Sequence, residues 1–251
     1  MKVLVTGSSR GLGTEIIKVF ASNGVDVIIN YNHSEKEAYK LADSISNVNV
    51  EVIKCDISNE DEVKDMFNKI DHLDYLINNA AISDDKDLKD KSALEFNRIL
   101  HTNLTGTFLV TKFAIDKMDK GSIVNISSTN AINTYYPESI DYDASKAGVI
   151  SLTHNFSKYL PDFNINCVCP DWIDTDITNL MDEEYKKKIK FIKKEDLAKL
   201  IYKICTNKEL KDQIIKLQSE GLTSATRGAV VAVEVNTGRV IAMASYPDFD
   251  P

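Results

Sequence analysis

The chain has 251 residues, of which 43% are hydrophobic and 27% charged, and its formal net charge is −8. This composition is typical of a soluble protein with one large α/β domain or two small ones. The negative charge argues against a nucleic-acid surface. The apolar run at the start is too short for a signal peptide, and no later run could span a bilayer, so we expect a cytoplasmic protein without membrane contact.

Six short apolar runs rich in β-branched residues alternate with segments of helical periodicity. The predicted strands are Lys2–Thr6, Asp26–Asn30, Asn49–Lys54, Tyr75–Asn78, Ser122–Ser127 and Ile165–Val168. Because parallel strands need crossover helices, the alternation predicts a parallel sheet covered on both faces. We therefore expect a doubly wound, Rossmann-like α/β fold in a single domain.

The first predicted strand runs into the glycine-rich loop Gly7-Ser8-Ser9-Arg10-Gly11-Leu12-Gly13, which opens an amphipathic helix. Glycine lets the backbone approach a pyrophosphate, and the helix N-terminus offers free N–H groups with a partial positive charge. The loop is therefore predicted to bind a dinucleotide through Gly7, Ser9, Arg10, Gly11, Leu12 and Gly13. A tight turn without a ligand is the alternative.

The end of the second strand bears on the choice of dinucleotide. Ile29-Asn30-Tyr31-Asn32-His33 lacks an acidic residue that would bind a ribose hydroxyl and repel a 2′-phosphate. The guanidinium of Arg10 could hold that phosphate. We therefore expect NADP(H) rather than NAD(H), with Asn32 among the residues that bind the cofactor.

A second motif, Tyr142-Asp143-Ala144-Ser145-Lys146, follows Ser127-Ser128 at the end of a strand. Residues i and i+4 share a helix face, so Lys146 can place its ammonium near the Tyr142 phenol and lower its pKa from about 10. Tyr142 would then give a proton to a carbonyl oxygen or take one from an alcohol. Ser128 would orient that oxygen, with Ser127 and Thr129 as rivals for this role.

Together, the two motifs resemble the short-chain dehydrogenase/reductase family, and the resemblance covers residues 1 to about 217. Within the family, the chain looks most similar to 3-oxoacyl-[acyl carrier protein] reductases. The resemblance implies about seven parallel strands, a homodimer or homotetramer, and NADP(H)-dependent hydride transfer between the nicotinamide and a carbonyl or alcohol. A 3-oxoacyl thioester is one implied substrate, and a sugar, polyol or other ketone remains open.

The same resemblance implies roles for residues outside the two motifs. Asn103 matches a catalytic asparagine that would hold a water and pass protons to Lys146. Further cofactor contacts are implied for Asp56, Ile57, Asn79, Ala80, Pro170, Ile173 and Thr175, in addition to Tyr142 and Lys146 themselves. Ala81 and Asp171 depart from the family pattern, which has glycine at both positions.

The end of the chain breaks the pattern. We expect an oxidoreductase domain in residues 1–220, whose last strand is Asp212–Leu217, and an extension in residues 221–251. Gly228–Val235 and Arg239–Ser245 flank Asn236-Thr237-Gly238, which predicts a β-hairpin. Residues 227–251 are similar to the first hairpin of the transpeptidase domain of penicillin-binding proteins but lack its serine and lysine. A fused extension and a native hairpin are the alternatives.

Other chemistries are less well supported. The cysteines Cys55, Cys167, Cys169 and Cys205 lack the spacing of metal ligands, and we expect reduced thiols and no metal. A non-catalytic NADP(H)-binding sensor or scaffold is the alternative function, against which Ser128, Tyr142 and Lys146 weigh. The tail suggests a cell-wall-related module, but that module's catalytic serine motif is missing.

Overall fold

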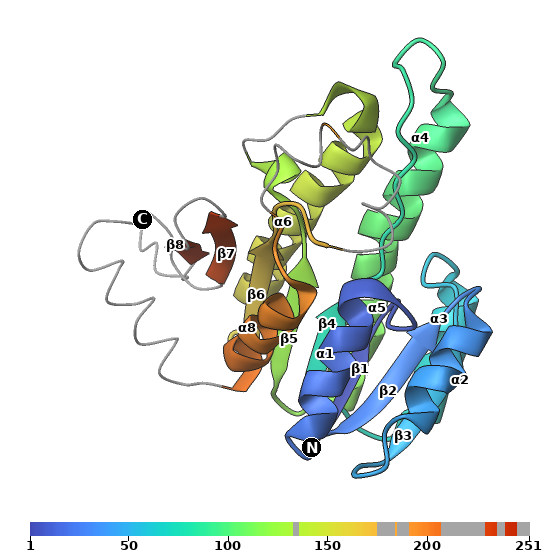
Figure 1. Ribbon diagram of the computed structural model, residues 1–251, viewed down its shortest axis with the longest axis vertical. Helices are drawn as coiled ribbons and strands as arrows, with labels where there is room; N and C mark the ends of the chain where they lie inside the picture. The colour runs from blue at the N-terminus through green and yellow to red at the C-terminus, as the bar shows by residue number, and fades with distance from the viewer. Residues whose placement is uncertain (133–135, 175–183, 185–190, 207–228, 235–238, 245–251) are drawn as a thin grey trace.

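The computed structural model describes residues 1–132, 136–174, 184, 191–206, 229–234 and 239–244. One sheet runs through it in the order β3-β2-β1-β4-β5-β6-β7-β8 (Figure 1). The strands are β1 Lys2–Val5, β2 Asp26–Tyr31, β3 Val50–Lys54, β4 Tyr75–Asn78, β5 Ser122–Ile126, β6 Asn164–Cys169, β7 Ala229–Glu234 and β8 Arg239–Ala244. Neighbouring strands are parallel from β3 to β7, and β8 is antiparallel to β7.

The six strands predicted before residue 170 are confirmed, and with them the doubly wound α/β fold. The predicted strand Asp212–Leu217 lies outside the described residues. Instead, β7 occupies the place beside β6, where Cys167 is paired with Val230. The pairing of β7 with β8 agrees with the hairpin prediction, but residues 235–238 are not described, so the hairpin and the domain boundary at residue 220 stay predictions.

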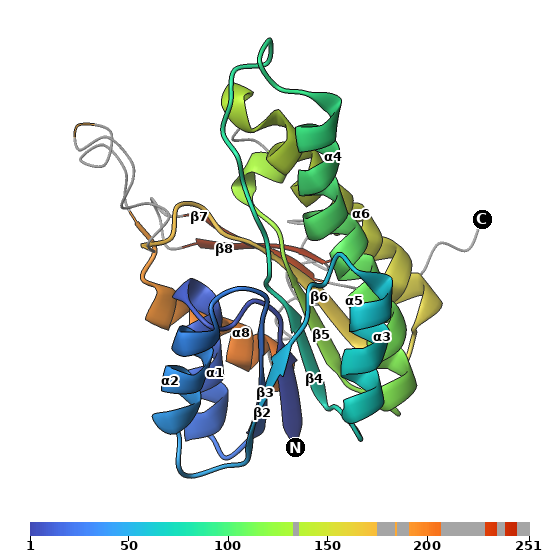
Figure 2. The same cartoon turned by 90° about the vertical axis from the view of Figure 1, so that its right-hand side faces the viewer.

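Helices cover both faces of the sheet (Figure 2). On one face lie α1 Gly11–Ser22, α2 Glu35–Asp43 and α8 Lys194–Thr206. On the other lie α3 Glu60–Lys69, α4 Ala93–Leu100, α5 Gly106–Ala114 and α6 Ile140–Tyr159. A π-helical turn, His101–Thr105, joins α4 to α5, and 3₁₀ turns occur at Ile115–Lys117, Thr129–Ala131 and Pro137–Ser139. None of the helices among the described residues has the length and hydropathy to cross a membrane.

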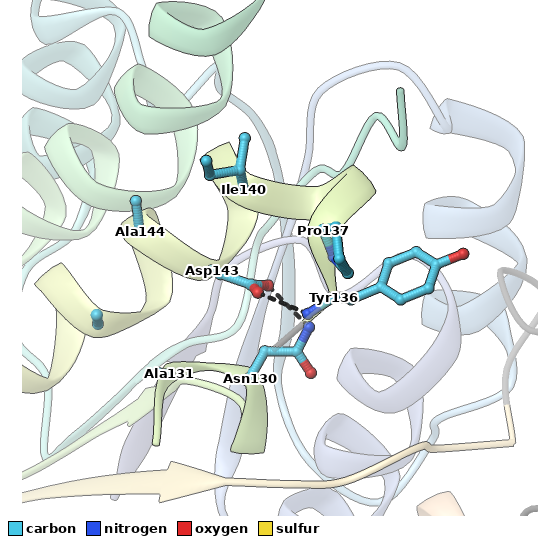
Figure 3. Close-up of a pocket in the computed structure, with 8 residues that line it drawn as sticks. Asn130, Ala131, Tyr136, Pro137, Ile140, Asp143 and Ala144 are labelled. Atoms are coloured by element: carbon cyan, nitrogen blue, oxygen red, sulfur yellow. Dashed lines mark hydrogen bonds between the residues drawn. The ribbon is translucent and has the colours of Figure 1, made fainter. Parts of the chain in front are cut away.

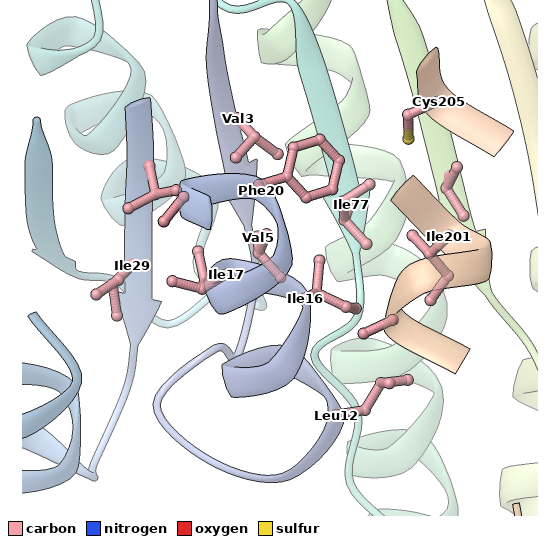
Figure 4. Close-up of a cluster of buried hydrophobic side chains, with 14 of the residues drawn as sticks. Val3, Val5, Leu12, Ile16, Ile17, Phe20, Ile29, Ile77, Ile201 and Cys205 are labelled. Carbon is pink, nitrogen blue, oxygen red and sulfur yellow. The ribbon is translucent and has the colours of Figure 1, made fainter. Parts of the chain in front are cut away.

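Strand alternation divides the core into two layers. Val3 and Val5 of β1 pack with α1, α2 and α8, whereas Leu4 belongs to the cluster under α3 and α5 (Figure 4). Phe20 of α1 is fully buried, and its ring centroid lies 5.4 Å from that of Tyr75 and 5.0 Å from that of Tyr202. Burial of one such side chain contributes about 1.5–3 kcal/mol. These contacts hold α1 against α8 and against β4.

The strand order places a topological switch point at the end of β1. β1 pairs with β2 on one side and with β4 on the other, so the connections leave this point in opposite directions. In open α/β sheets, ligands bind outside the carboxyl ends of the strands at such a point. The glycine-rich loop and the polar ends of β4 and β5 all lie at this edge.

Candidate active site

The loop after β1 approaches the end of β4 closely. Gly7 and Gly11 have positive φ angles of 61° and 59°, which glycine adopts without strain. A Cβ added to Gly7 would lie 2.9 Å from the Cα of Ala80. A larger residue at position 7 would therefore push the ends of β1 and β4 apart.

Side-chain hydrogen bonds hold this loop to the neighbouring strands. The Thr6 hydroxyl oxygen accepts from the backbone N–H groups of Asn79 and Ala80, both at 3.0 Å. Asn79 Nδ2 returns a bond to the Thr6 carbonyl at 2.9 Å. On the other side, Asn30 Oδ1 accepts from Gly7 N at 3.0 Å. The sequence predicted Asn79 and Ala80 as cofactor residues, but it did not single out Thr6 or Asn30 as part of the site.

The N-terminus of α1 is suited to an anion. Arg10 occupies the N-cap without a side-chain capping bond, and the first turn contains no acidic residue. By contrast, Asn59 caps α3 and Ser92 caps α4, and both helices carry acids in the first turn. The partial positive charge of α1 is therefore not compensated by its own side chains. The Arg10 side chain is exposed, with no partner among the described residues.

The predicted adenosine-side residues lie together beyond β2 and β3. Burial alone would raise the pKa of the Asp56 carboxyl, but hydrogen bonds from Ser58 and Asn32 lower it below its usual value. Ile57 is buried in the core, where it packs against Gly106. The side chain available to a ligand here is therefore that of Asp56, with Asn32 beside it.

The remaining predicted cofactor residues are placed in part. Ser9 and Leu12 are buried within the loop and the first turn of α1. The Pro170 carbonyl accepts from Thr129 N at 2.9 Å, which joins the loops after β5 and β6. Ile173 forms a parallel bridge with Ile192. Thr175 lies outside the described residues.

The structure brings Ser128 and Tyr142 together. The side chains of Ser128 and Tyr142 are hydrogen-bonded, and this bond lowers the pKa of the phenol. The Ser128 hydroxyl also contacts Asn130, since it donates to Oδ1 at 3.5 Å and accepts from the backbone N–H at 3.2 Å. Ser127 has a different partner, because its hydroxyl donates to the Lys146 carbonyl at 2.8 Å. The buried hydroxyl of Thr129 has no hydrogen-bond partner among the described residues. Of the three hydroxyls weighed for the role, Ser128 is the one in contact with the phenol.

Lys146 is buried behind Tyr142. Its ammonium lies 5.5 Å from the centroid of the Tyr142 ring and donates to the Ile126 carbonyl at 2.7 Å. Only 3% of the residue is exposed, and this burial lowers its pKa from 10.5 to about 8. Cys167 and Cys169, which point to the same side of β6 as expected, oppose the shift.

The expected lowering of the Tyr142 pKa is wrong. Burial raises the pKa of the phenol to about 12, and the charges of Asp143 and Asp85 act in the same direction. The bond from Ser128 opposes this shift, whereas Lys146 is not among its main causes. The sequence argument counted the nearby cation but not the loss of solvent around the phenol. The Tyr142 phenol is therefore protonated at neutral pH.

Asn103 sits in the π-helical turn between α4 and α5. Its Oδ1 accepts from Ile82 N at 2.8 Å, and its Nδ2 donates to the Ile82 carbonyl at 2.9 Å and to Ser145 Oγ at 3.0 Å. Single π turns in α-helices are frequent at functional sites. The side chain of Asn103 thus joins the segment after β4 to the helix that carries Tyr142 and Lys146.

A pocket of about 390 Å³ lies beside the first turns of α6, and neither Tyr142 nor Lys146 is among the residues that line it (Figure 3). Its lining residues are Asn130, Ala131, Tyr136, Pro137, Ile140, Asp143, Ala144 and Ala147. Asp143 accepts from Asn130 Nδ2 at 2.8 Å, from Tyr136 N at 3.1 Å and from Ser139 Oγ at 2.9 Å. Asp143, which the sequence did not single out, therefore ties the segment after Ser128 to the first turn of α6.

Comparison with known proteins assigns the family. A family profile described as short chain dehydrogenase matches residues 1–186. The chain is a member of the short-chain dehydrogenase/reductase family. It is therefore an oxidoreductase that uses a nicotinamide cofactor.

Two curated relatives are 3-oxoacyl-[acyl-carrier-protein] reductases. The one from Aquifex aeolicus is 36% identical over 81% of this chain and 89% of its own length. The one from Chlamydia pneumoniae is 34% identical over 74% of this chain and 78% of its own length. Among solved structures, a short chain dehydrogenase from Burkholderia cenocepacia, in complex with NADP, superposes with a TM-score of 0.77. It is 26% identical and covers 81% of this chain and 89% of that chain.

The described residues fit a nicotinamide dinucleotide. The left-handed glycines, the uncompensated N-terminus of α1 and the paired Asn32 and Asp56 follow one another along the carboxyl edge of the sheet. No group of three or more metal-ligating side chains occurs within the part of the chain that the structure describes.

The space around Gly13 yields a test of the cradle. In Gly13→Ala, the new Cβ would lie 2.7 Å from Ser8 Cα and 2.8 Å from the Gly7 carbonyl oxygen, so backbone must move. We expect a loss of about 1–3 kcal/mol in unfolding free energy and at least tenfold weaker binding of the reduced nicotinamide cofactor, NADH or NADPH, by fluorescence titration. Gly24→Ala is the control, because at φ 75° it adds strain but its Cβ meets no atom within 4 Å. An unchanged affinity for the reduced nicotinamide cofactor in Gly13→Ala would contradict a role of this loop in binding it.

The lowered pKa of Lys146 predicts a pH-dependent stability. The unfolded lysine keeps its proton up to about pH 10.5, whereas the folded one releases it near pH 8. The wild-type protein should therefore gain stability between these two pH values, by about 3 kcal/mol at about 1.4 kcal/mol per pH unit. Lys146→Met cannot show this gain. Urea unfolding at pH 7 and at pH 10.5 measures the difference, and parallel pH profiles of the two proteins would argue against a buried charge.

Proposed function

We propose that this protein reduces a carbonyl compound with NADPH, or oxidises the corresponding alcohol with NADP⁺. The observation that carries the proposal is the convergence of Ser128, Tyr142 and Lys146 at the carboxyl end of β5. The nicotinamide would supply or accept the hydride. The side chains of the protein would position the carbonyl group and transfer one proton to or from its oxygen.

In the proposed mechanism, Tyr142 is the acid. Its phenol is protonated at neutral pH, so it can give a proton to the carbonyl oxygen as hydride reaches the carbon. Ser128 donates a hydrogen bond to the same oxygen and fixes its position. Lys146 stabilises the resulting phenolate, because its pKa of about 8 leaves most of it charged at pH 7. Asn103 would hold a water that returns the proton.

For the cofactor, we propose NADP(H). The loop offers Arg10, whose guanidinium is exposed and suited to a 2′-phosphate, and no acidic side chain ends β2. The Burkholderia cenocepacia neighbour is in complex with NADP, which supports the same choice. Contacts from the other predicted residues at the carboxyl edge, Thr175 included, are part of this proposal.

For the substrate, we propose a 3-oxoacyl thioester as the first candidate. The support is the identity to 3-oxoacyl-[acyl-carrier-protein] reductases over about three quarters of the chain or more. Sugars, polyols and simple ketones are the other carbonyl classes to test. We also propose that the active form is a homodimer or homotetramer and that residues 221–251 are an extension to the catalytic domain.

A non-catalytic NADP(H)-binding sensor or scaffold is the second candidate. It needs the glycine-rich loop but has no use for a buried lysine beneath a tyrosine. Keeping Lys146 buried is unfavourable at neutral pH, because its charge is stripped of solvent. This unfavourable desolvation of Lys146 supports a catalytic role for the site rather than cofactor binding alone.

Tyr142→Phe tests the proposed acid. The variant keeps the ring but removes the transferable proton, so turnover should fall by about 10²-fold or more while NADPH binding is kept. Turnover is measured as NADPH consumption with a panel of 3-oxoacyl thioesters, sugars and ketones. Tyr159→Phe is the matched control, since Tyr159 ends the same helix with 77% of its surface exposed. Near-normal turnover in Tyr142→Phe would refute the mechanism, and NADPH binding without any turnover by the wild type would favour the sensor.

Arg10→Ala tests the cofactor choice. Loss of a charge-assisted hydrogen bond to a 2′-phosphate is worth about 1.5–3 kcal/mol, or roughly ten- to a hundredfold in the Kd for NADPH. The Kd for NADH should stay nearly unchanged. Arg98→Ala is the control, because this exposed arginine lies on α4 and pairs with Asp84. A wild-type protein that prefers NADH would overturn the assignment.

A further inference from the structure

A buried ion pair joins Lys91 to Asp141, the residue immediately before Tyr142 in the chain. Lys91 Nζ is 2.7 Å from Asp141 Oδ2, and the two side chains are 3% and 0% exposed. The second carboxylate oxygen of Asp141 accepts from the backbone N–H of Tyr142 at 2.9 Å. The same lysine also donates to the Asp84 carbonyl at 2.7 Å. The Asp141 carboxylate thus connects Lys91, which lies in a different loop, to the backbone of Tyr142, the proposed acid.

The lysine belongs to the segment between β4 and α4, which forms one side of the site. Ile82 of this segment exchanges two backbone bonds with the side chain of Asn103. Lys86 N donates to the Glu138 carbonyl at 2.9 Å. Burial is the largest cause of the raised pKa of the Tyr142 phenol, and the charge of nearby Asp85 adds a smaller contribution. Residues 82–91, which we call the β4–α4 wall, are therefore fastened at both ends to the catalytic helices.

Simple stabilisation does not account for this pair. Two charges removed from water lose hydration free energy that their mutual attraction barely offsets. Proteins in which well-packed neutral side chains replace a buried pair are often as stable as the original or more stable. The exposed Arg98–Asp84 pair, whose side chains are 53% and 43% exposed, shows the usual alternative within the same part of the chain. What a buried pair supplies is a single, directional attachment between two elements.

We propose that the Lys91–Asp141 pair is a positioning device for the proposed reductase, which holds the β4–α4 wall against the first turn of α6. Lys91 and Asp141 are positioning residues, since the structure shows their contacts with each other, Asp84 and Tyr142. Through them, the wall keeps a fixed distance from Tyr142 and from Asn103. The expected effect of the pair on turnover rests on the proposed function, whereas its expected effect on the position of the β4–α4 wall does not.

The test separates attachment from stability. Lys91→Met leaves the Asp141 carboxylate buried without a counter-charge, so the midpoint of thermal unfolding should fall clearly. Adding Asp141→Asn removes the unpaired charge and keeps an acceptor for Tyr142 N–H, so the midpoint should largely recover. Lys112→Met with Glu60→Gln, which removes an exposed pair between α5 and α3 outside the wall, is the matched control and should change neither stability nor turnover.

Two further readouts are taken on the double variant. Amide hydrogen exchange in residues 82–91 should be at least tenfold faster than in the wild type, with exchange in β4 and β5 unchanged. The kcat for carbonyl reduction should be about tenfold lower, with little change in the Kd for NADPH. A double variant that recovers its unfolding midpoint, its exchange protection and its kcat would overturn the proposal, because the pair would then be structural only.

Two outcomes need separate handling. If the double variant does not fold, Asp141→Asn alone decides by the same readouts, since it is the milder change: wild-type exchange there overturns the proposal, and faster exchange supports it. If the wild-type protein turns over no carbonyl compound, the proposed function fails. Hydrogen exchange in residues 82–91 still decides whether the pair holds the wall.

Discussion

The close contact between the end of β1 and the end of β4 is the constraint on which the rest of the site depends. Gly7 has no side chain, so Ala80 can approach it, and the Thr6 hydroxyl then bridges two consecutive N–H groups after β4. This contact sets where α1 begins and where the segment after β4 departs. The phosphate cradle and the β4–α4 wall are thus two sides of one junction.

Burial shapes the chemistry of the catalytic residues more than their mutual charge does. Loss of solvent moves the pKa of Tyr142 up and that of Lys146 down, so the phenol is kept protonated and the ammonium is close to releasing its proton. Such a pair is ready to act as an acid in the reducing direction. A bound, oxidised nicotinamide would add a positive charge, which favours the phenolate needed for the reverse reaction. The same residues can therefore serve both directions.

The sequence predicted the elements better than the connections between them. The β-branched runs identify β1 to β6 because burial on both faces leaves no room for polar alternation, and the spacing of Tyr142 and Lys146 follows from helix geometry. The sequence favoured Ser128 but left Ser127 and Thr129 as rivals, because the choice depends on which hydroxyl the neighbouring backbone occupies. Asn30 and Thr6 were missed for a similar reason. Lys91 and Asp141 are fifty positions apart, and each looks like an ordinary surface charge until the fold brings them together.

The strand beside β6 has a consequence for how this protein can change. β7 is attached to β6 by backbone pairing, and ladder hydrogen bonds do not distinguish one side chain from another. The place next to β6 can therefore be filled by an extended segment of almost any origin, provided that its length and direction suit. The junction of β1 with β4 lies three strands away and does not depend on this choice. The outer edge of the sheet is thus a site where segments can be exchanged, for instance to graft a new binding surface, while the reacting centre is left as it is.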